Sequence, residues 1–195
     1  MDFPLRPGAL TDRRGLFRQG LGRWIEGLVE RTEERVVTRR YLRPPGALPE
    51  IEFLAACTRC GICADVCPPK AIITVRSDGG LAAGTPYLDV AVQPCTVCPE
   101  MPCAAACPTD ALIVPEDRWA GYRLGVLALE PERCITFHGT ACGVCAGVCP
   151  VGPAALTIDE GGHPVIRQEN CVGCGLCVRA CVTMPSSLQL TLAEA

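Results

Sequence analysis

Sixteen cysteines stand out in this chain of 195 residues, and their spacing indicates metal chemistry. The first run, CTRCGICADVCP, starts at Cys57 and has the spacing C-x2-C-x2-C-x3-C-P. Thiolates at this spacing bind iron-sulfur clusters: the first three hold one 4Fe-4S cubane, and the fourth reaches a neighbouring cubane. Such runs therefore work in pairs.

Three further runs depart from the first in different ways. CTVCPEMPCAAACP widens its second gap to four residues, CITFHGTACGVCAGVCP has seven residues in its first gap, and CVGCGLCVRAC has Val182 in place of proline. Four runs of four cysteines predict four 4Fe-4S clusters. The predicted ligands are Cys57, Cys60, Cys63, Cys67, Cys95, Cys98, Cys103, Cys107, Cys134, Cys142, Cys145, Cys149, Cys171, Cys174, Cys177 and Cys181.

The prediction of four complete clusters depends on Cys134, because this cysteine stands apart from the three that follow it. If it were a bystander, one cluster would lack a thiolate and would need a substitute such as His138, a less common ligand. The arithmetic favours Cys134 as a ligand. His138 and His163 are then polar loop residues.

Disulfides and zinc are the competing explanations for so many cysteines. A disulfide scaffold needs an oxidising compartment, and residues 1–30 lack the uninterrupted apolar stretch of roughly 7 to 15 residues found in a signal peptide. Zinc binds paired C-x2-C units. It requires neither the third cysteine two residues on nor the recurring C-P. A zinc-binding interaction module remains the weaker alternative.

Charge is divided unevenly along the chain. Residues 1–50 contain ten arginines and seven acids, whereas residues 51–195 contain eight basic and fourteen acidic residues. Thiolate-bound clusters would add further negative charge to the second part. This balance argues against nucleic acid as a partner. No segment is long and apolar enough for a membrane span.

Short strands and helices must position the cysteines. Apolar segments predict a short hairpin after each of the four runs: AIITV with YLDVAV, ALIV with RLGVLAL, ALTI with PVI, and SLQLTL after the fourth. A short helix is expected to begin between the third and last cysteines of each run. Aromatic residues make up only 5% of the chain, so clusters would have to staple a thin core. The predicted fold class is α+β, with two ferredoxin-like modules that bind two clusters each.

The first 50 residues predict a separate, arginine-rich arm. Phe17, Leu21, Trp24 and Leu28 recur at helical spacing, and Pro44 ends the pattern. We expect residues 1–50 to form a helical arm that docks a partner. A surface helix packed on its own domain is the alternative.

The order of these irregular runs, preceded by RPPGALPE, resembles the NapG/MauM ferredoxin-type proteins across residues 43–190. The resemblance implies four 4Fe-4S clusters in two modules and an electron-transfer role. It also carries the ligand positions over to this chain, Cys134 included. Because no catalytic motif is visible, we expect a non-catalytic subunit beside a large molybdenum or tungsten oxidoreductase or a quinol-oxidising membrane protein. The alternative is an assembly or maturation factor for a metalloenzyme.

The N-terminal segment TDRRGLFR resembles the charged part of a twin-arginine export signal. Arg23, Glu26 and Glu30 interrupt what would be its apolar part. The segment also resembles the start of NapF-type cytoplasmic polyferredoxins. We therefore expect the cytoplasm, with the periplasm as the alternative if the degenerate segment still functions.

The pairing of the runs is left open by composition. This chain also resembles the four-cluster subunits of molybdenum oxidoreductases. That resemblance implies a nested order, in which the first run pairs with the fourth and the second with the third. Residues 51–90 and 160–195 would then form an outer module and residues 91–159 an inner one. Sequential pairing, first with second and third with fourth, uses the same sixteen cysteines.

Overall fold

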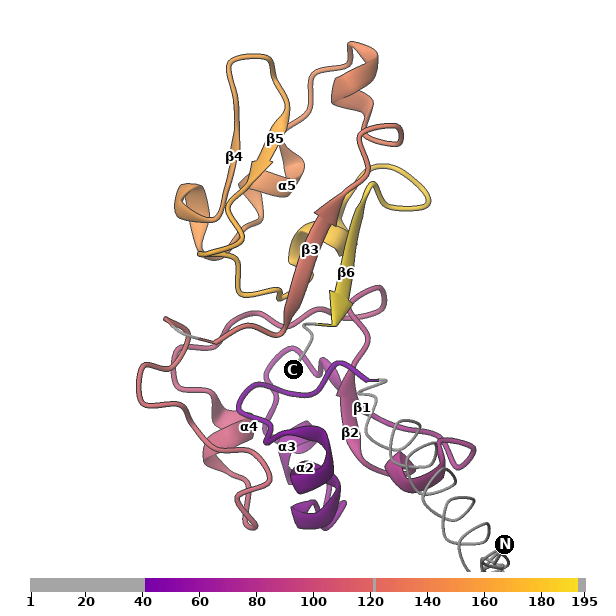
Figure 1. Cartoon of the computed structure of the whole chain (residues 1–195), viewed down its shortest axis with the longest axis vertical. Helices are drawn as coiled ribbons and strands as arrows, with labels where there is room; N and C mark the ends of the chain where they lie inside the picture. The colour runs from indigo at the N-terminus through magenta and orange to yellow at the C-terminus, as the bar shows by residue number, and fades with distance from the viewer. Residues whose placement is uncertain (1–40, 121, 193–195) are drawn as a thin grey trace, which may run out of the picture. The chain divides into compact units, whose positions relative to one another are not determined.

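The protein is described by a computed structural model over residues 41–120 and 122–192 (Figure 1). Its secondary structure consists of short helices and two-stranded sheets, as the α+β prediction anticipated. The predicted arm helix around residues 17–28 lies outside the described residues. The twin-arginine-like segment at residues 11–18 does so too.

The first half of the described chain contains one hairpin and several short helices. Its helices are α2 (Glu50–Ala56), α3 (Ile62–Asp65), η1 (Gly80–Ala82) and α4 (Pro102–Ala105), and its strands are β1 (Ile72–Thr74) and β2 (Pro86–Leu88). The strands pair antiparallel with Ile72 opposite Leu88. The hairpin predicted after the first run of cysteines is confirmed.

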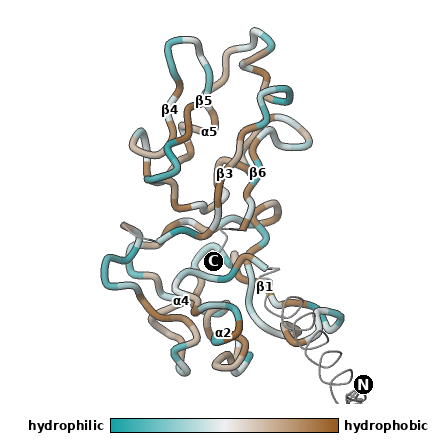
Figure 2. The backbone as a smooth tube through the Cα atoms, viewed as in Figure 1, coloured by the Kyte–Doolittle hydropathy of each residue, from teal (hydrophilic) through white to brown (hydrophobic). Residues whose placement is uncertain are grey.

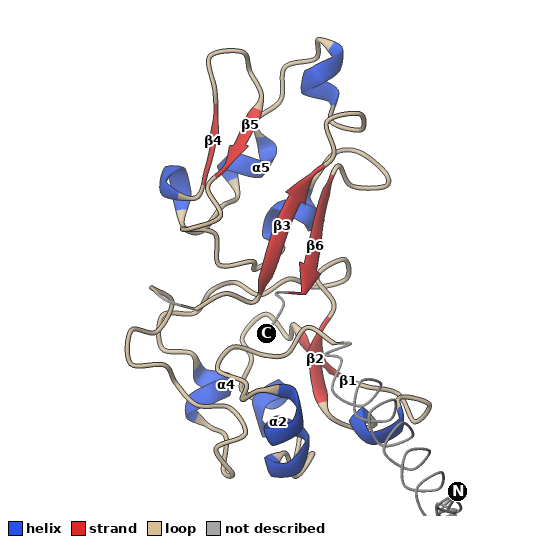
Figure 3. Ribbon diagram, in the orientation of Figure 1, coloured by secondary structure: helices blue, strands red, loops and turns tan. Residues whose placement is uncertain are grey.

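The second half contains two separate two-stranded sheets (Figure 3). Its strands are β3 (Gly125–Leu129), β4 (Leu156–Ile158), β5 (Pro164–Ile166) and β6 (Leu188–Leu192), and its helices are η2 (Ile135–His138), α5 (Val144–Gly147), η3 (Gly152–Ala154) and α6 (Leu176–Ala180). β4 and β5 pair antiparallel with Leu156 opposite Ile166. This confirms the hairpin predicted after the third run.

The hairpins predicted after the second and fourth runs are wrong. RLGVLAL supplies β3, which pairs not with ALIV but with β6 from SLQLTL, so that Leu127 lies opposite Leu190. Within ALIV, Leu112 instead forms an isolated bridge with Ala47. An apolar alternation identifies a strand, but it does not identify the partner when the two strands are about sixty residues apart.

A short helix begins one residue before the third cysteine of each run, which confirms the predicted helices with a small shift. Gly61 precedes α3 with φ +81°, and Gly175 precedes α6 with φ +80°. Glycine adopts this left-handed conformation without the steric penalty of a Cβ. These glycines turn the chain into the helix that carries the last cysteine away.

The core is small and contains cysteines among its apolar side chains. Phe53, Met101 and Leu124 are fully buried in the larger apolar cluster, together with several thiols. Leu127, Leu156 and Leu188 form a second cluster around Cys177. Apolar residues gather along strands and helices, while the turn between β4 and β5 is hydrophilic (Figure 2). The predicted thin core is confirmed.

The predicted boundary of the arm at residue 50 is wrong. The chain divides between Thr38 and Arg39, and residues 41–49 pack into the first half. Leu42 forms a bridge with Leu88, and Ala47 bridges Leu112. The prolines in PPGALPE shape this packed segment and do not mark a linker.

Arg43 explains why a charged segment can be buried. Its side chain is inaccessible to solvent and forms an ion pair of 2.5 Å with Glu50. It also donates hydrogen bonds of 2.8 Å to the hydroxyl of Thr85 and to the carbonyl of Pro86. Its guanidinium lies 4.6 Å from the ring centre of Phe53, within the range of a cation–π contact.

Replacing Arg43 with methionine should lower the stability of the first half by about 3–5 kcal/mol, because Glu50 would keep a buried, unpaired charge. Arg133→Met is the matched control, since Arg133 pairs with Glu130 at the surface and an exposed pair contributes at most about 1 kcal/mol. The measurement is the urea midpoint for loss of cluster absorbance. Equal midpoints for the two variants would contradict the buried-pair interpretation.

Candidate metal centres

Four cavities in the described chain are each lined by four cysteines. We name them by their run: site I has Cys57, Cys60, Cys63 and Cys107; site II has Cys67, Cys95, Cys98 and Cys103; site III has Cys134, Cys142, Cys145 and Cys181; site IV has Cys149, Cys171, Cys174 and Cys177. All sixteen are free thiols. Every predicted ligand therefore lies at one of the four sites.

Each site takes three cysteines from one run and the last cysteine from its partner run. The short helices make this exchange: α3 leads from Cys63 at site I to Cys67 at site II, and α4 leads from Cys103 back to Cys107. The exchange is the geometry expected for paired ferredoxin runs.

The nested pairing of the runs is wrong. Site I receives Cys107, and site III receives Cys181, so the first run pairs with the second and the third with the fourth. The predicted outer module of residues 51–90 and 160–195 and inner module of residues 91–159 are therefore wrong as well. Below, the first module is the half that contains the first two runs, and the second module is the half that contains the last two. Residues 112–125 connect them along the chain.

The sulfurs surround each cavity instead of meeting at one point. Among residues 41–120 and 122–192, no three His, Cys, Asp or Glu side chains are close enough to hold a single metal ion. A single tetrahedral zinc ion would need its sulfurs about 2.3 Å away. A cubane presents separate irons to separate thiolates, so four sulfurs spread over a cavity wall fit a cluster.

Burial raises the pKa of several of these thiols. It is the main reason why the pKa of Cys95 is raised to about 12 and that of Cys177 to about 12, with smaller contributions from neighbouring cysteines. Without metal these thiols are neutral at physiological pH. Since ligation requires thiolates, cluster binding must release their protons.

Cys181 behaves in the opposite way. Burial favours the neutral thiol, but hydrogen bonds from Ser187 and Thr183 outweigh burial and lower the pKa of Cys181 to about 6. Its Sγ lies 3.2 Å from the hydroxyl of Thr183 and 3.3 Å from that of Ser187. The surroundings of site III therefore favour a thiolate at Cys181.

The four sites follow one another in the order I, II, IV, III. Besides burial, the charge of Cys103 contributes to the raised pKa of Cys63, which places site II beside site I. Likewise Cys174 affects the pKa of Cys95, and Cys145 affects that of Cys177. The two outermost sites are thus those of the first and third runs.

The two modules meet where site II approaches site IV. The backbone N–H of Cys95 donates a hydrogen bond of 3.3 Å to the carbonyl of Cys174. A Cβ on Gly175 would lie only 2.4 Å from the Cβ of Val90. Glycine is required here by both its positive φ and this close approach.

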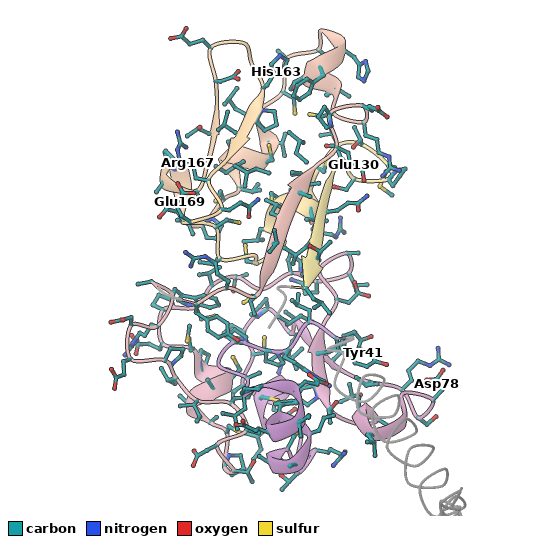
Figure 4. The ribbon with its side chains drawn as sticks, in the orientation of Figure 1. Tyr41, Asp78, Glu130, His163, Arg167 and Glu169 are labelled. Carbon is teal, nitrogen blue, oxygen red and sulfur yellow. The ribbon has the colours of Figure 1, made fainter. Side chains whose placement is uncertain are left out.

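Neither histidine lines a site. The Nε2 of His138 lies 2.8 Å from the carbonyl of Glu132. His163 lies on the turn between β4 and β5 (Figure 4), and its ring stacks on Phe137 with 4.1 Å between ring centres. Cys134, in contrast, lines site III with the rest of its run. His163 thus lies in a turn, whereas His138 is the last residue of η2, and the role of Cys134 as a ligand stays a prediction.

Sequence reasoning missed the hydroxyl groups beside the sulfurs of site III. Thr136 lies 3.2 Å from the Sγ of Cys134, and Thr183 and Ser187 flank Cys181. The sequence gives a weak signal for the first two, because each stands two residues after a ligand. Ser187 has no such signal, since it is brought to Cys181 by the pairing of β3 with β6.

Family comparisons agree with the geometry of both modules. Residues 56–111 and residues 126–182 each match a 4Fe-4S dicluster domain. These two stretches contain the sequentially paired runs. The chain is therefore a ferredoxin-type electron-transfer protein with two dicluster domains and four 4Fe-4S clusters.

Full-length relatives identify the family more narrowly. The methylamine utilization ferredoxin-type protein MauM of Methylorubrum extorquens is 37% identical over 77% of this chain and 72% of its own length. The ferredoxin-type protein NapG of Escherichia coli is 38% identical over 72% of this chain and 66% of its own. NapF of Haemophilus influenzae is 31% identical over 72% and 74%. The chain belongs to the MauM/NapG family of ferredoxin-type proteins.

The contact between the modules can be tested with Gly175→Ala. Both this variant and Gly61→Ala force a positive φ on alanine, at roughly 1–2 kcal/mol, but a Cβ on Gly61 meets no atom within 4 Å. We expect Gly175→Ala to loosen the contact between Cys95 and Cys174, so that trypsin cleaves faster after Arg123. Identical cleavage rates in the two variants would show that Val90 yields without consequence.

Proposed function

We propose that this protein is a non-catalytic subunit that passes single electrons along its four sites, between a partner redox enzyme and a second carrier. The serial order of the four cysteine-lined cavities carries the proposal. The bound clusters supply reversible one-electron chemistry. The sixteen cysteines would bind them, with each site's fourth thiol coming from the partner run.

The chain's own residues would hold the clusters close together and away from water. Cysteines of adjacent sites are near enough to affect one another's acidity, as at Cys95 and Cys174. Leu127, Leu156 and Leu188 pack beside Cys177. Limited access of water to a site is one of the factors that set its potential.

The family resemblance supports our proposal for the partner, and the geometry does not bear on it. A large molybdenum or tungsten oxidoreductase is the partner we favour, and a quinol-oxidising membrane protein is the alternative electron donor. Among the described helices, none has the length and apolar character to cross a membrane.

We further propose a cytoplasmic location, because Arg23, Glu26 and Glu30 interrupt the segment that an export signal would keep apolar. A fusion of residues 1–50 to a phosphatase that is active only after export gives the test. Retention without phosphatase activity is expected, and export of the fusion would place the protein in the periplasm.

Cys134→Ser tests the ligand assignment. Anaerobically purified protein should contain about four irons per cluster, and the variant should lose one cluster's EPR signal while the other three remain. His138→Ala is the matched control and should keep all four, because His138 faces the carbonyl of Glu132. An unchanged spectrum in Cys134→Ser would make Cys134 a bystander, and zinc in place of iron would overturn the proposed function.

Anaerobic affinity purification tests the role of the subunit. We expect a stable complex of fixed stoichiometry with a redox enzyme that already contains its own cofactors. Binding that occurs only with an immature apoenzyme, and ends once that enzyme is loaded, would indicate an assembly factor instead.

A further inference from the structure

Site III differs from the other three sites in the hydroxyl groups around its sulfurs. Thr136 lies 3.2 Å from Cys134, while Thr183 and Ser187 lie 3.2 Å and 3.3 Å from Cys181. Site I has one hydroxyl contact, 3.8 Å from Thr109 to Cys107, and site II has one of 3.6 Å from the exposed Thr96 to Cys98. Within the described residues, site IV has none.

Backbone N–H groups do not distinguish the sites, because they lie beside sulfurs at all four. The backbone N–H of Ala64 donates to Cys63 at site I, that of Ala71 to Cys67 at site II, and that of Leu176 to Cys174 at site IV. Ala146 does the same for Cys145 at site III. Hydroxyl groups are therefore the feature that sets site III apart.

The hydroxyls of site III must donate to the sulfurs once a cluster is bound, because a ligating thiolate has no proton. At Thr183 the orientation is already fixed: its oxygen accepts a hydrogen bond of 3.0 Å from the backbone N–H of Ser187, which leaves its own proton for Cys181. At Thr136 the oxygen also lies 3.4 Å from the Nδ1 of His163, and a proton on that nitrogen would donate to the oxygen and leave the hydroxyl proton of Thr136 for Cys134.

Two of these donors are held rigidly in buried positions. Ser187 is 2% exposed, and its carbonyl accepts a hydrogen bond of 2.7 Å from the N–H of Glu130 at the end of β3. Thr136 is 8% exposed within η2. A hydrogen bond to a charged acceptor is stronger than a neutral one, and a low local dielectric strengthens it further.

We propose that the hydroxyl groups of Thr136, Thr183 and Ser187 give site III the highest reduction potential of the four sites. One added electron makes a thiolate-bound cluster more negative, and donors aimed at its sulfurs stabilise that charge. Site III, like site I, lies at an end of the series and has only one negatively charged neighbouring cluster, so the hydroxyl groups are what distinguish the two end sites. This inference rests on the proposed function and adds a direction: electrons that enter at site I and pass through sites II and IV collect at site III.

Cations near other sites work against this order but act less directly. Arg59 bonds to the carbonyl of Cys57 at site I from an exposed position. At site IV, burial raises the pKa of Cys171, and the nearby Arg123 makes the smallest of the contributions that oppose this. Charges in contact with water are screened, whereas the three hydroxyls touch the sulfurs.

Potentiometric reduction of the holoprotein, followed by EPR, tests the proposal. Ser187→Ala, Thr183→Val and Thr136→Val should each move the first of the four reduction steps to lower potential and leave the later three in place. Ser186→Ala is the matched control, because the Ser186 hydroxyl accepts from the N–H of Leu188 and contacts no sulfur. Thr136→Ser should retain the wild-type first step.

Three results would overturn the proposal: a first step that none of the variants moves, a later step that moves instead, or an equal shift in Ser186→Ala. If a threonine variant loses iron, Cys134→Ser gives a second test. The cluster whose EPR signal this variant loses must be the one that is reduced first in the wild type. Wild-type protein without four reducible clusters would refute the proposed function itself. If four clusters are reduced but the hydroxyl variants leave the potential of the first step unchanged, only this inference is refuted.

Discussion

The fold depends on one constraint, which is that the last thiol of each run must leave the site built by the first three and complete the site of the partner run. Helices of four or five residues achieve this, as α3 does for Cys67 and α5 for Cys149. Neither run of a pair can complete a site alone. Cluster binding and folding are therefore coupled within each module, which explains how a chain with 5% aromatic residues can hold a defined structure.

The same constraint separates what the sequence predicts from what it does not. Spacing within a run is local, so the three cysteines of each site, the helix starts and the hairpins β1–β2 and β4–β5 were predictable. Pairing between runs is not local. Nested and sequential orders use the same cysteines, and they differ only in which site receives the last cysteine of each run, as at Cys107 and Cys181. The burial of Arg43 and the pairing of β3 with β6 were missed for the same reason, since each depends on residues far along the chain.

The two modules are not equivalent, and the difference lies in how their ends are closed. In the first module, residues 41–49 cover the hairpin and bring Arg43 into the interior. In the second, β6 returns to pair with β3 and places Ser187 against Cys181. Contacts that close a module thus also determine what surrounds its clusters. A chain with two similar dicluster domains can in this way acquire four sites with different properties.

The long first gap of the third run follows the same logic. Cys134 lines site III together with Cys142 and Cys145, so the seven residues of the long gap do not enlarge the site. They form η2 instead, and Gly139 turns the chain back with φ +81°. In the two-residue gap of the second run, the hydroxyl of Thr96 stays exposed. In the long gap, Thr136 is buried against its cysteine while Phe137 stacks on His163. A change in gap length can therefore alter the surroundings of one cluster while all four of its ligands stay the same.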